Sequence, residues 1–339
     1  MNYRNFSLTK FVEASGCAAK LEPSAIDKNL ANLIEPHPNL LSSISSNEDA
    51  GVFRLNDDFA LVQTLDFMTP LVDDPYIFGQ IAAANALSDV FAMGGEAMTA
   101  MNIVGFDSFH FSDEILVEIL EGGKSKIAES GAVLVGGHTI KTPEIYYGLS
   151  VAGRVSPNNF WSNNTAQVGD VLILTKPLGT GIISTAIKAD FLEFSEFKTA
   201  LEQITKLNLY ASRAVRDLEI HAATDITGFS LLGHSLEMIN EKISFKFNES
   251  EIPIFSPVQK CVDNGLVPAG GYKNLAFIKK NANVEPDIKF CDPQTNGGLL
   301  LAVGKNDALK AVERLKNAGY EYATIIGEVI PRDEFKIYF

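Results

Sequence analysis

The sequence predicts a protein of the α/β (α+β) class, folded as two domains behind an N-terminal segment with little regular structure. A chain of 339 residues is longer than one ordinary hydrophobic core requires. Apolar runs typical of strands alternate with segments whose apolar residues recur at helical spacing. A polar stretch at residues 156–169 separates the halves. We therefore expect a segment 1–48 and domains at 49–156 and 168–339.

The first domain is predicted to alternate strands and helices. Residues 59–65 are an apolar run typical of a buried strand, and Asp66 is expected at its end. Gly94 and Gly95 are typical of the end of a helix. The other elements expected are helices at 76–93 and 113–130, and strands at 100–104, 132–135 and 146–155.

The two ends of the chain have different patterns. Residues 1–48 lack periodicity and are interrupted by Gly16 and three prolines, as in a tail or a functional lid. The second half begins with an apolar run at 171–174 and then alternates helices and strands, with turn-rich segments at 225–228 and 292–298. No repeat of solenoid period is present.

The composition is that of a globular protein, with 46% hydrophobic and 21% charged residues. Its 28 basic and 42 acidic residues give a formal net charge of −14. A field of this sign repels nucleic acid and anionic membrane surfaces, so neither is an expected partner. Phosphate substrates remain compatible with it, provided that bound cations invert the local field.

Cysteine usage indicates a reducing compartment. Cys17, Cys261 and Cys291 are odd in number and far apart, which is a poor disulfide framework and has no zinc-ligand spacing. The N-terminus lacks the apolar core of a signal peptide, and no run of about 18 apolar residues occurs. We expect a cytoplasmic protein, with Cys261 and Cys291 in the core.

The common phosphate-binding loops are absent. Gly123, Lys124 and Ser125 supply only the end of a Walker loop, because Glu118 stands where its first glycine belongs. They also fall within a predicted helix. No GxGxxG follows a strand, so a Rossmann cofactor is not indicated.

Phosphates can also be bound through metal ions, and a set of aspartates at structural transitions indicates this alternative. Asp49 precedes Gly51, Asp66 follows a strand, and Asp225 precedes a turn. Asp89 lies one helical turn from Asn85 in an otherwise apolar helix. Magnesium prefers such oxygen ligands and bridges carboxylates to substrate phosphates. For each aspartate alone, a helix cap or turn remains the alternative.

Two further segments are candidates for chemistry. In Gly136-Gly137-His138-Thr139, glycines after a buried strand allow backbone amides to face an anion, and Thr139 adds a hydroxyl; a tight strand exit is the alternative. In Gly16-Cys17-Ala18-Ala19-Lys20, a nearby ammonium favours the nucleophilic thiolate; an ordinary loop cysteine is the alternative.

Taken together and in this order, these segments resemble the selenophosphate synthetases (selenide, water dikinases). The matching blocks are residues 16–20, 48–52, 64–67, 84–95, 136–139, 174–181, 224–229 and 291–298. The aspartate helix and the strand-Gly-Gly-His segment resemble the wider superfamily of aminoimidazole ribonucleotide synthetase-like ATP enzymes. Gly-Cys-x-x-Lys and the late Cys-Asp-Pro-Gln-Thr resemble the selenide enzymes in particular.

The resemblance implies conversion of ATP, selenide and water to selenophosphate, AMP and phosphate, with several magnesium ions and a homodimer paired through the N-terminal sheets. It implies that Cys17 handles selenium and that Lys20 contacts phosphates. The implied metal ligands are Asp49, Asp89 and Asp225. The implied nucleotide contacts are Lys20, Ser46, Asn47, Glu48, Asp66, Asp89 and, from the partner subunit, Gly137, His138 and Thr139.

Two departures limit what the resemblance carries over. Ala19 stands where relatives often have a second cysteine, so Cys17 would act alone, and Asn296 stands where a serine is common.

Two alternative functions remain. Another ATP enzyme of the superfamily, such as a small-molecule kinase, would explain the aspartates but not Cys17 with Lys20. A non-enzymatic nucleotide or selenium carrier would bind without turnover.

Overall fold

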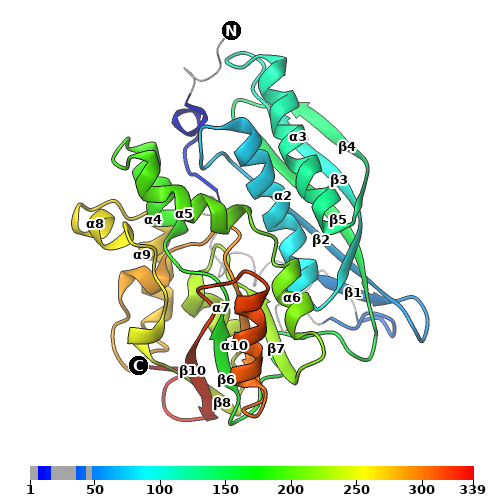
Figure 1. Ribbon diagram of the computed structural model, residues 1–339, viewed down its shortest axis with the longest axis vertical. Helices are drawn as coiled ribbons and strands as arrows, with labels where there is room; N and C mark the ends of the chain where they lie inside the picture. Colours follow the sequence, from blue (N-terminus) through cyan, green and yellow to red (C-terminus); the bar gives the residue numbers. More distant parts are fainter. Residues whose placement is uncertain (1–6, 17–35, 43–47) are drawn as a thin grey trace.

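The computed structural model describes residues 7–16, 36–42 and 48–339. In this part of the chain, two β-sheets with their helices are stacked along the long axis of the molecule (Figure 1). The predicted α/β (α+β) class is therefore confirmed.

The first sheet has five strands in the order β1-β2-β5-β3-β4. β3 and β4 are parallel and the other neighbours are antiparallel. The helix α3 makes the crossover between the two parallel strands, as such a connection requires. The bounds are β1 Gly51–Arg54, β2 Ala60–Met68, β3 Glu96–Phe106, β4 Val133–Lys141, β5 Tyr146–Val155, α2 Pro75–Ala92 and α3 Asp113–Ser130.

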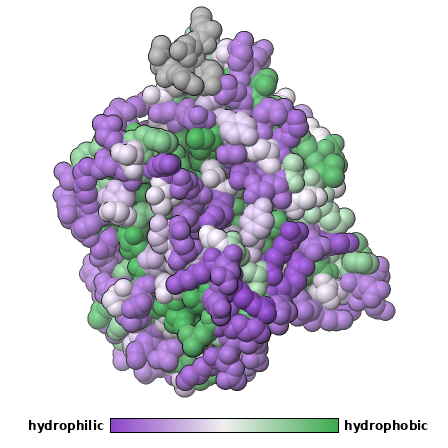
Figure 2. Space-filling view, in the orientation of Figure 1, coloured by the Kyte–Doolittle hydropathy of each residue, from purple (hydrophilic) through white to green (hydrophobic). Residues whose placement is uncertain are grey.

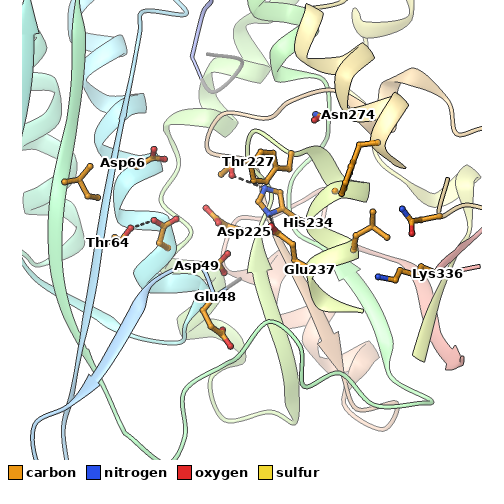
Figure 3. Close-up of a pocket in the computed structure, with 17 residues that line it drawn as sticks. Glu48, Asp49, Thr64, Asp66, Asp225, Thr227, His234, Glu237, Asn274 and Lys336 are labelled. Atoms are coloured by element: carbon orange, nitrogen blue, oxygen red, sulfur yellow. Dashed lines mark hydrogen bonds and ion pairs between the residues drawn. The ribbon is translucent and has the colours of Figure 1, made fainter. Parts of the chain in front are cut away.

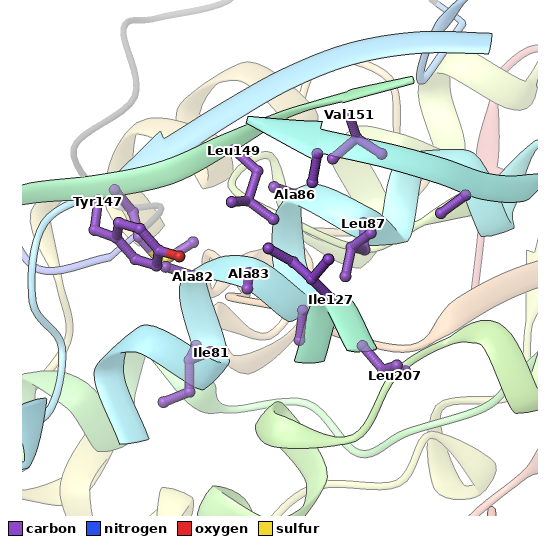
Figure 4. Packing of buried hydrophobic residues seen from close by; sticks show 14 of the residues in the cluster. Ile81, Ala82, Ala83, Ala86, Leu87, Ile127, Tyr147, Leu149, Val151 and Leu207 are labelled. Atoms are coloured by element: carbon purple, nitrogen blue, oxygen red, sulfur yellow. The ribbon is translucent and has the colours of Figure 1, made fainter. Parts of the chain in front are cut away.

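The helix α2 is the centre of the first domain. Asp74 caps it by accepting a hydrogen bond from the Ile77 N–H at 2.9 Å, and Pro75 is its first residue. Its many alanines allow it to pack closely against the sheet, α3 and the second domain, so it is buried nearly all round (Figure 4). The predicted helix at 76–93 is thus confirmed to within one residue.

The second sheet has six strands in the order β11-β8-β10-β6-β9-β7. Its strands are β6 Val171–Leu174, β7 Ile220–Asp225, β8 Ile243–Phe247, β9 Leu299–Val303, β10 Thr324–Pro331 and β11 Ile337–Tyr338. The α-helices are α4 Thr180–Lys188, α5 Phe194–Thr205, α6 Leu209–Val215, α7 Ser230–Met238, α8 Val258–Asp263, α9 Ala269–Ile278 and α10 Ala308–Asn317. The 3₁₀ helices are η2 Leu8–Phe11, η5 Glu249–Glu251 and η6 Ile288–Cys291.

The turn at residues 292–298 joins the two domains. The backbone N–H of Asn296 donates to Oδ1 of Asn85 on α2 at 2.7 Å. The Asn296 side chain donates to the carbonyl oxygens of Ile204, at 2.6 Å, and Lys206, at 3.1 Å. Asn296 has a φ of +45°, a conformation that asparagine tolerates better than most residues. Its backbone N–H therefore ties the second domain to α2, while its side chain ties the turn to the end of α5 within the second domain.

Residues 7–16 are more ordered than the sequence pattern predicted. Leu8 is buried, and the buried Thr9 donates its hydroxyl to Asp73 at 2.8 Å. Lys188 on α4 donates to the carbonyl oxygens of Val12 and Glu13 at 2.6 and 3.0 Å. Contacts to both domains therefore fix this stretch, because its few apolar residues find buried positions that a loose tail would lack.

Two details of the first sheet correct the sequence analysis. Asp66 does not end its strand, because β2 continues to Met68 in register with β5. Gly136 does not begin a turn after a buried strand: β4 is a largely exposed edge strand that continues to Lys141. A register shift against β3 accommodates the bulge beside Gly136, whose φ is +148°, and pairing with β3 continues past it.

Hydrophilic side chains dominate the face seen in Figure 2, and apolar ones form only scattered patches on it. In the described part of the chain, no helix combines the length and apolar character needed to cross a membrane.

Candidate functional site

A cavity of about 680 Å³ lies where the two domains meet. The first domain lines it from β2 and α2, and the second from the end of β7, from α7 and from α9. Figure 3 shows acidic side chains from both domains pointing into this common space. Glu48, Asp49, Asp66, Asp89 and Asp225, which the sequence analysis selected, all line it.

Strand β2 and helix α2 form one wall of the cavity, and each presents two polar side chains at the spacing of its own secondary structure. Thr64 and Asp66 lie two residues apart and so face the same side of β2, toward α2. Asn85 and Asp89 lie one helical turn apart on the facing side of α2. The Thr64 hydroxyl donates to Asp89, and the Asn85 amide donates to Asp66. These two bonds fix both carboxylates at the cavity wall.

Asp49 comes from the entry to β1 and is fixed by the second domain. Its Oδ1 accepts hydrogen bonds from the Thr224 hydroxyl at 2.8 Å and from the Asn163 amide at 3.4 Å. Thr224 immediately precedes Asp225, so the end of β7 places these two carboxylates together. Neighbouring Glu48 accepts from the Ser162 hydroxyl and from the Asn163 N–H, the latter at 3.0 Å.

The surroundings of Asp49 disfavour the negative charge of its carboxylate. Burial raises the pKa of its carboxyl well above the usual value, and the negative charges of Asp225 and Asp89 raise it further. Its Oδ2 is buried and accepts no hydrogen bond from the described residues. A buried carboxylate in this position is costly unless a positive charge or a proton compensates it.

The carboxylates are spread along the cavity wall. Among the described residues, no three side chains of His, Cys, Asp or Glu converge closely enough to hold one metal ion. This spacing fits magnesium, which usually takes one or two carboxylates and completes its shell with water and substrate phosphates. The residues present therefore fit metal ions that arrive with a nucleotide.

The opposite wall contains functional groups that the sequence analysis missed. The Thr227 Oγ1 lies 3.0 Å from Nε2 of His234 on α7, and Nδ1 of His234 lies 2.8 Å from a carboxylate oxygen of Glu237. All three side chains line the cavity. The spacing of His234 and Glu237, three residues apart on a helix, was the available signal.

The other predicted site residues lie elsewhere. Gly137, His138 and Thr139 are on the edge strand β4 and do not line this chain's cavity. Cys17, Lys20, Ser46 and Asn47 lie outside the described residues. Gly16, immediately before Cys17, donates its N–H to the Thr69 carbonyl at 3.2 Å, and a Cβ there would lie 2.7 Å from Oγ1 of Thr295.

The two later cysteines are core residues, as the sequence predicted. Cys261 and Cys291 are both fully buried. Burial raises the pKa of the Cys291 thiol to about 12, and it also raises the pKa of Cys261. Neither thiol is therefore suited to act as a nucleophile.

Comparisons with known proteins agree with this architecture. The family described as AIR synthase related protein, N-terminal domain, matches residues 47–155, and its C-terminal domain counterpart matches residues 167–339. The fold resembles thiamine monophosphate kinase from Aquifex aeolicus (TM-score 0.64, 15% identity, 93% of this chain and 95% of that one). It also resembles hydrogenase maturation protein HypE (TM-score 0.65, 16% identity, 90% and 89%). The chain is thus one of the AIR synthase related proteins.

Curated relatives show to which family within the AIR synthase related proteins the chain belongs. The chain is 49% identical over 339 residues to a selenide, water dikinase of Campylobacter jejuni, covering 98% of each chain. It is 46% identical over 336 residues to one of Clostridioides difficile, covering 96% of each. The chain belongs to the selenide, water dikinase family.

Proposed function

We propose that this chain catalyses the synthesis of selenophosphate, AMP and phosphate from ATP, selenide and water, in the cytoplasm. The observation that carries the proposal is the buried Asp49 carboxylate, which shares a cavity with Asp89 and Asp225 at the domain junction. The names of the curated relatives support the same reaction. Phosphoryl transfer needs charge neutralisation and alignment more than covalent chemistry, and an acidic cavity that recruits cations provides both.

Each predicted residue has a role in this proposal. Magnesium neutralises the triphosphate when bound. Asp49, Asp89 and Asp225 hold the metal ions. Glu48 and Asp66 line the nucleotide site, together with Ser46, Asn47 and Asp89. Lys20 stabilises the charge on the transferring phosphoryl group, and Cys17 handles the selenium.

The test is selenide-dependent AMP formation from ATP under anaerobic conditions. We expect Lys20→Ala to lower the rate about a hundredfold, because it removes a cation from the transition state. Cys17→Ser should form little AMP when selenide is limiting. Lys124→Ala is the matched control, since this lysine is exposed on α3 and pairs there with Glu121, which does not line the cavity. Full activity in Lys20→Ala would refute the role given to Lys20.

The same assay separates the alternatives. A simple small-molecule kinase releases ADP whether or not selenide is present. A carrier binds ATP or selenium without turnover. Only the proposed reaction couples selenide consumption to AMP.

We also propose that the chain acts as a homodimer that pairs through the face of the first sheet opposite α2 and α3. Strand alternation places large apolar side chains on this face, each between 46% and 60% exposed: Leu65, Phe67, Met101, Val133 and Ile140. An apolar surface of this kind in an acidic protein calls for a partner. A second copy fits, since its own face is equally apolar, and it would bring Gly137, His138 and Thr139 toward a nucleotide.

An arginine in this face is expected to separate the dimer. We expect Met101→Arg to give a monomer in sedimentation experiments, because the charge would be buried without a partner. Leu309→Arg is the control: Leu309 is 78% exposed on α10, away from this sheet. If Met101→Arg had the same oligomeric state as the control, this face would not be the interface.

A further inference from the structure

Thr227, His234 and Glu237 form an unbroken hydrogen-bonded chain along the cavity wall (Figure 3). A carboxylate only accepts hydrogen bonds, so Nδ1 of His234 carries a proton toward Glu237. With the proton of the ring on Nδ1, Nε2 is an acceptor, and the Thr227 hydroxyl donates a hydrogen bond to it at 3.0 Å. The ring is held against Phe229, with centroids 5.6 Å apart. This places a histidine base behind a hydroxyl that faces the cavity.

The charge of Glu237 argues against a purely structural role. Glu237 lines the same cavity as Asp49, Asp89 and Asp225, so its negative charge adds to theirs. Holding the His234 ring requires only a hydrogen-bond acceptor, which a neutral side chain also supplies. A negative charge beside an acidic cluster is costly, and it is compensated when the imidazole becomes positively charged.

The proposed reaction has a step that needs such a base. Forming AMP breaks two phosphoanhydride bonds, and only one phosphoryl group goes to selenium. The other goes to water. In the simplest order, selenide takes the terminal phosphoryl group and leaves ADP in the cavity, where water attacks its β-phosphorus. That water must lose a proton as its oxygen bonds to phosphorus.

We propose that Thr227, His234 and Glu237 form the proton relay for this hydrolysis; the inference rests on the proposed function. The water oxygen bonds to the β-phosphorus as the bond from that phosphorus to the bridging oxygen breaks, and AMP leaves with that oxygen. One water proton passes to Oγ1 of Thr227 as the Thr227 proton passes to Nε2 of His234. The other proton stays on the phosphate. Thr227 is the catalytic residue, and His234 and Glu237 act through it.

A single-turnover experiment tests the relay. Enzyme in excess over adenine-labelled ATP is mixed anaerobically with magnesium and selenide and quenched in acid, and ATP, ADP and AMP are separated. For Thr227→Val and His234→Ala, we expect the rate of ADP conversion to AMP, relative to the rate of ATP loss, to fall about a hundredfold. Glu237→Gln, which keeps an acceptor but removes the charge, should have a smaller effect of the same kind.

Two controls separate proton transfer from structure. His221 also pairs with a carboxylate, at 2.7 Å to Asp170, but does not line the cavity, so His221→Ala should leave the ratio of rates unchanged. Added imidazole should restore AMP formation in His234→Ala but not in Thr227→Val. Pyrazole, of the same size but far less basic, should not restore it.

Several outcomes would overturn the relay. One is an unchanged ratio of the two rates in both variants. Another is a parallel loss of both steps in both variants, and a third is recovery at high magnesium, which would make these residues supports of the metal site. Failure of the proposed function itself gives a different result: the wild-type protein would then form no AMP that depends on selenide.

Discussion

Asp49→Asn is expected to lower the rate of magnesium-dependent AMP formation by about a thousandfold or more. The same substitution is expected to make the metal-free protein more stable. The activity falls because the variant loses a carboxylate that helps neutralise the triphosphate. The stability rises because the native carboxylate is buried beside Asp225 and Asp89, which raise its pKa. A neutral amide in its place avoids that repulsion and keeps the Thr224 hydroxyl as a donor to its oxygen.

The raised pKa of Asp49 also predicts in which direction the stability of the metal-free protein should change with pH. Because the pKa of Asp49 is raised in the folded protein, its contribution to stability is full below the pKa of an unfolded aspartate, about 3.9. It is lost as the pH rises through the folded value. In EDTA, the wild-type melting temperature should therefore fall over the range above about pH 4, and this part of the fall should be missing in Asp49→Asn.

Melting curves with EDTA and with magnesium and an ATP analogue provide the measurement. Magnesium with the analogue should stabilise the wild-type protein strongly and Asp49→Asn little. Asp58→Asn is the control, since Asp58 is exposed in the turn before β2. Equal stabilisation of Asp49→Asn and wild type would show that Asp49 does not hold the metal.

The fold was predictable where one local signal dominated. The helical spacing and the glycine pair at 94–95 predicted α2 to within one residue. The strand β4 was not predictable in this way, because pairing with β3 past a bulge is a tertiary effect that overrides the turn tendency of Gly136 and Gly137. Residues 7–16 were missed for a related reason: their order comes from contacts to both domains, which local periodicity does not contain.

The site was predictable in part. Helical spacing placed Asn85 and Asp89 on one face of a helix. Asp49, Asp66 and Asp225 were selected first as aspartates at expected structural transitions and then by the family resemblance, and all three line the same cavity. Spacing alone could not bring Asp49 to Asp225, because they are distant in sequence and are brought together by tertiary contacts such as the hydrogen bond from Thr224 to Asp49. The pair of His234 and Glu237 was missed because a polar pair on a helix is usually a solvated one.

The second large effect is expected from the crossing of α2 and α3. At Gly79, a Cβ would lie 2.0 Å from the carbonyl oxygen of Ile119, and at Gly122 a Cβ would lie 2.0 Å from that of Tyr76. Both obstacles are backbone atoms, which cannot rotate away, so the helices touch through these glycines. We therefore expect Gly79→Ala to lower the free energy of unfolding by about 3 kcal/mol or more.

This result would be opposite in sign to the ordinary effect of the substitution, since alanine favours a helix over glycine by about 1 kcal/mol. Gly271→Ala on α9 is the matched control, because its nearest neighbour is a side-chain methyl of Val267 at 3.3 Å. Denaturant unfolding compares the two. Since α2 also carries Asn85 and Asp89, spreading the helices should displace one wall of the acidic cavity and slow AMP formation as well. A Gly79→Ala protein as stable and as active as wild type would show that α2 does not need this close contact to place its carboxylate.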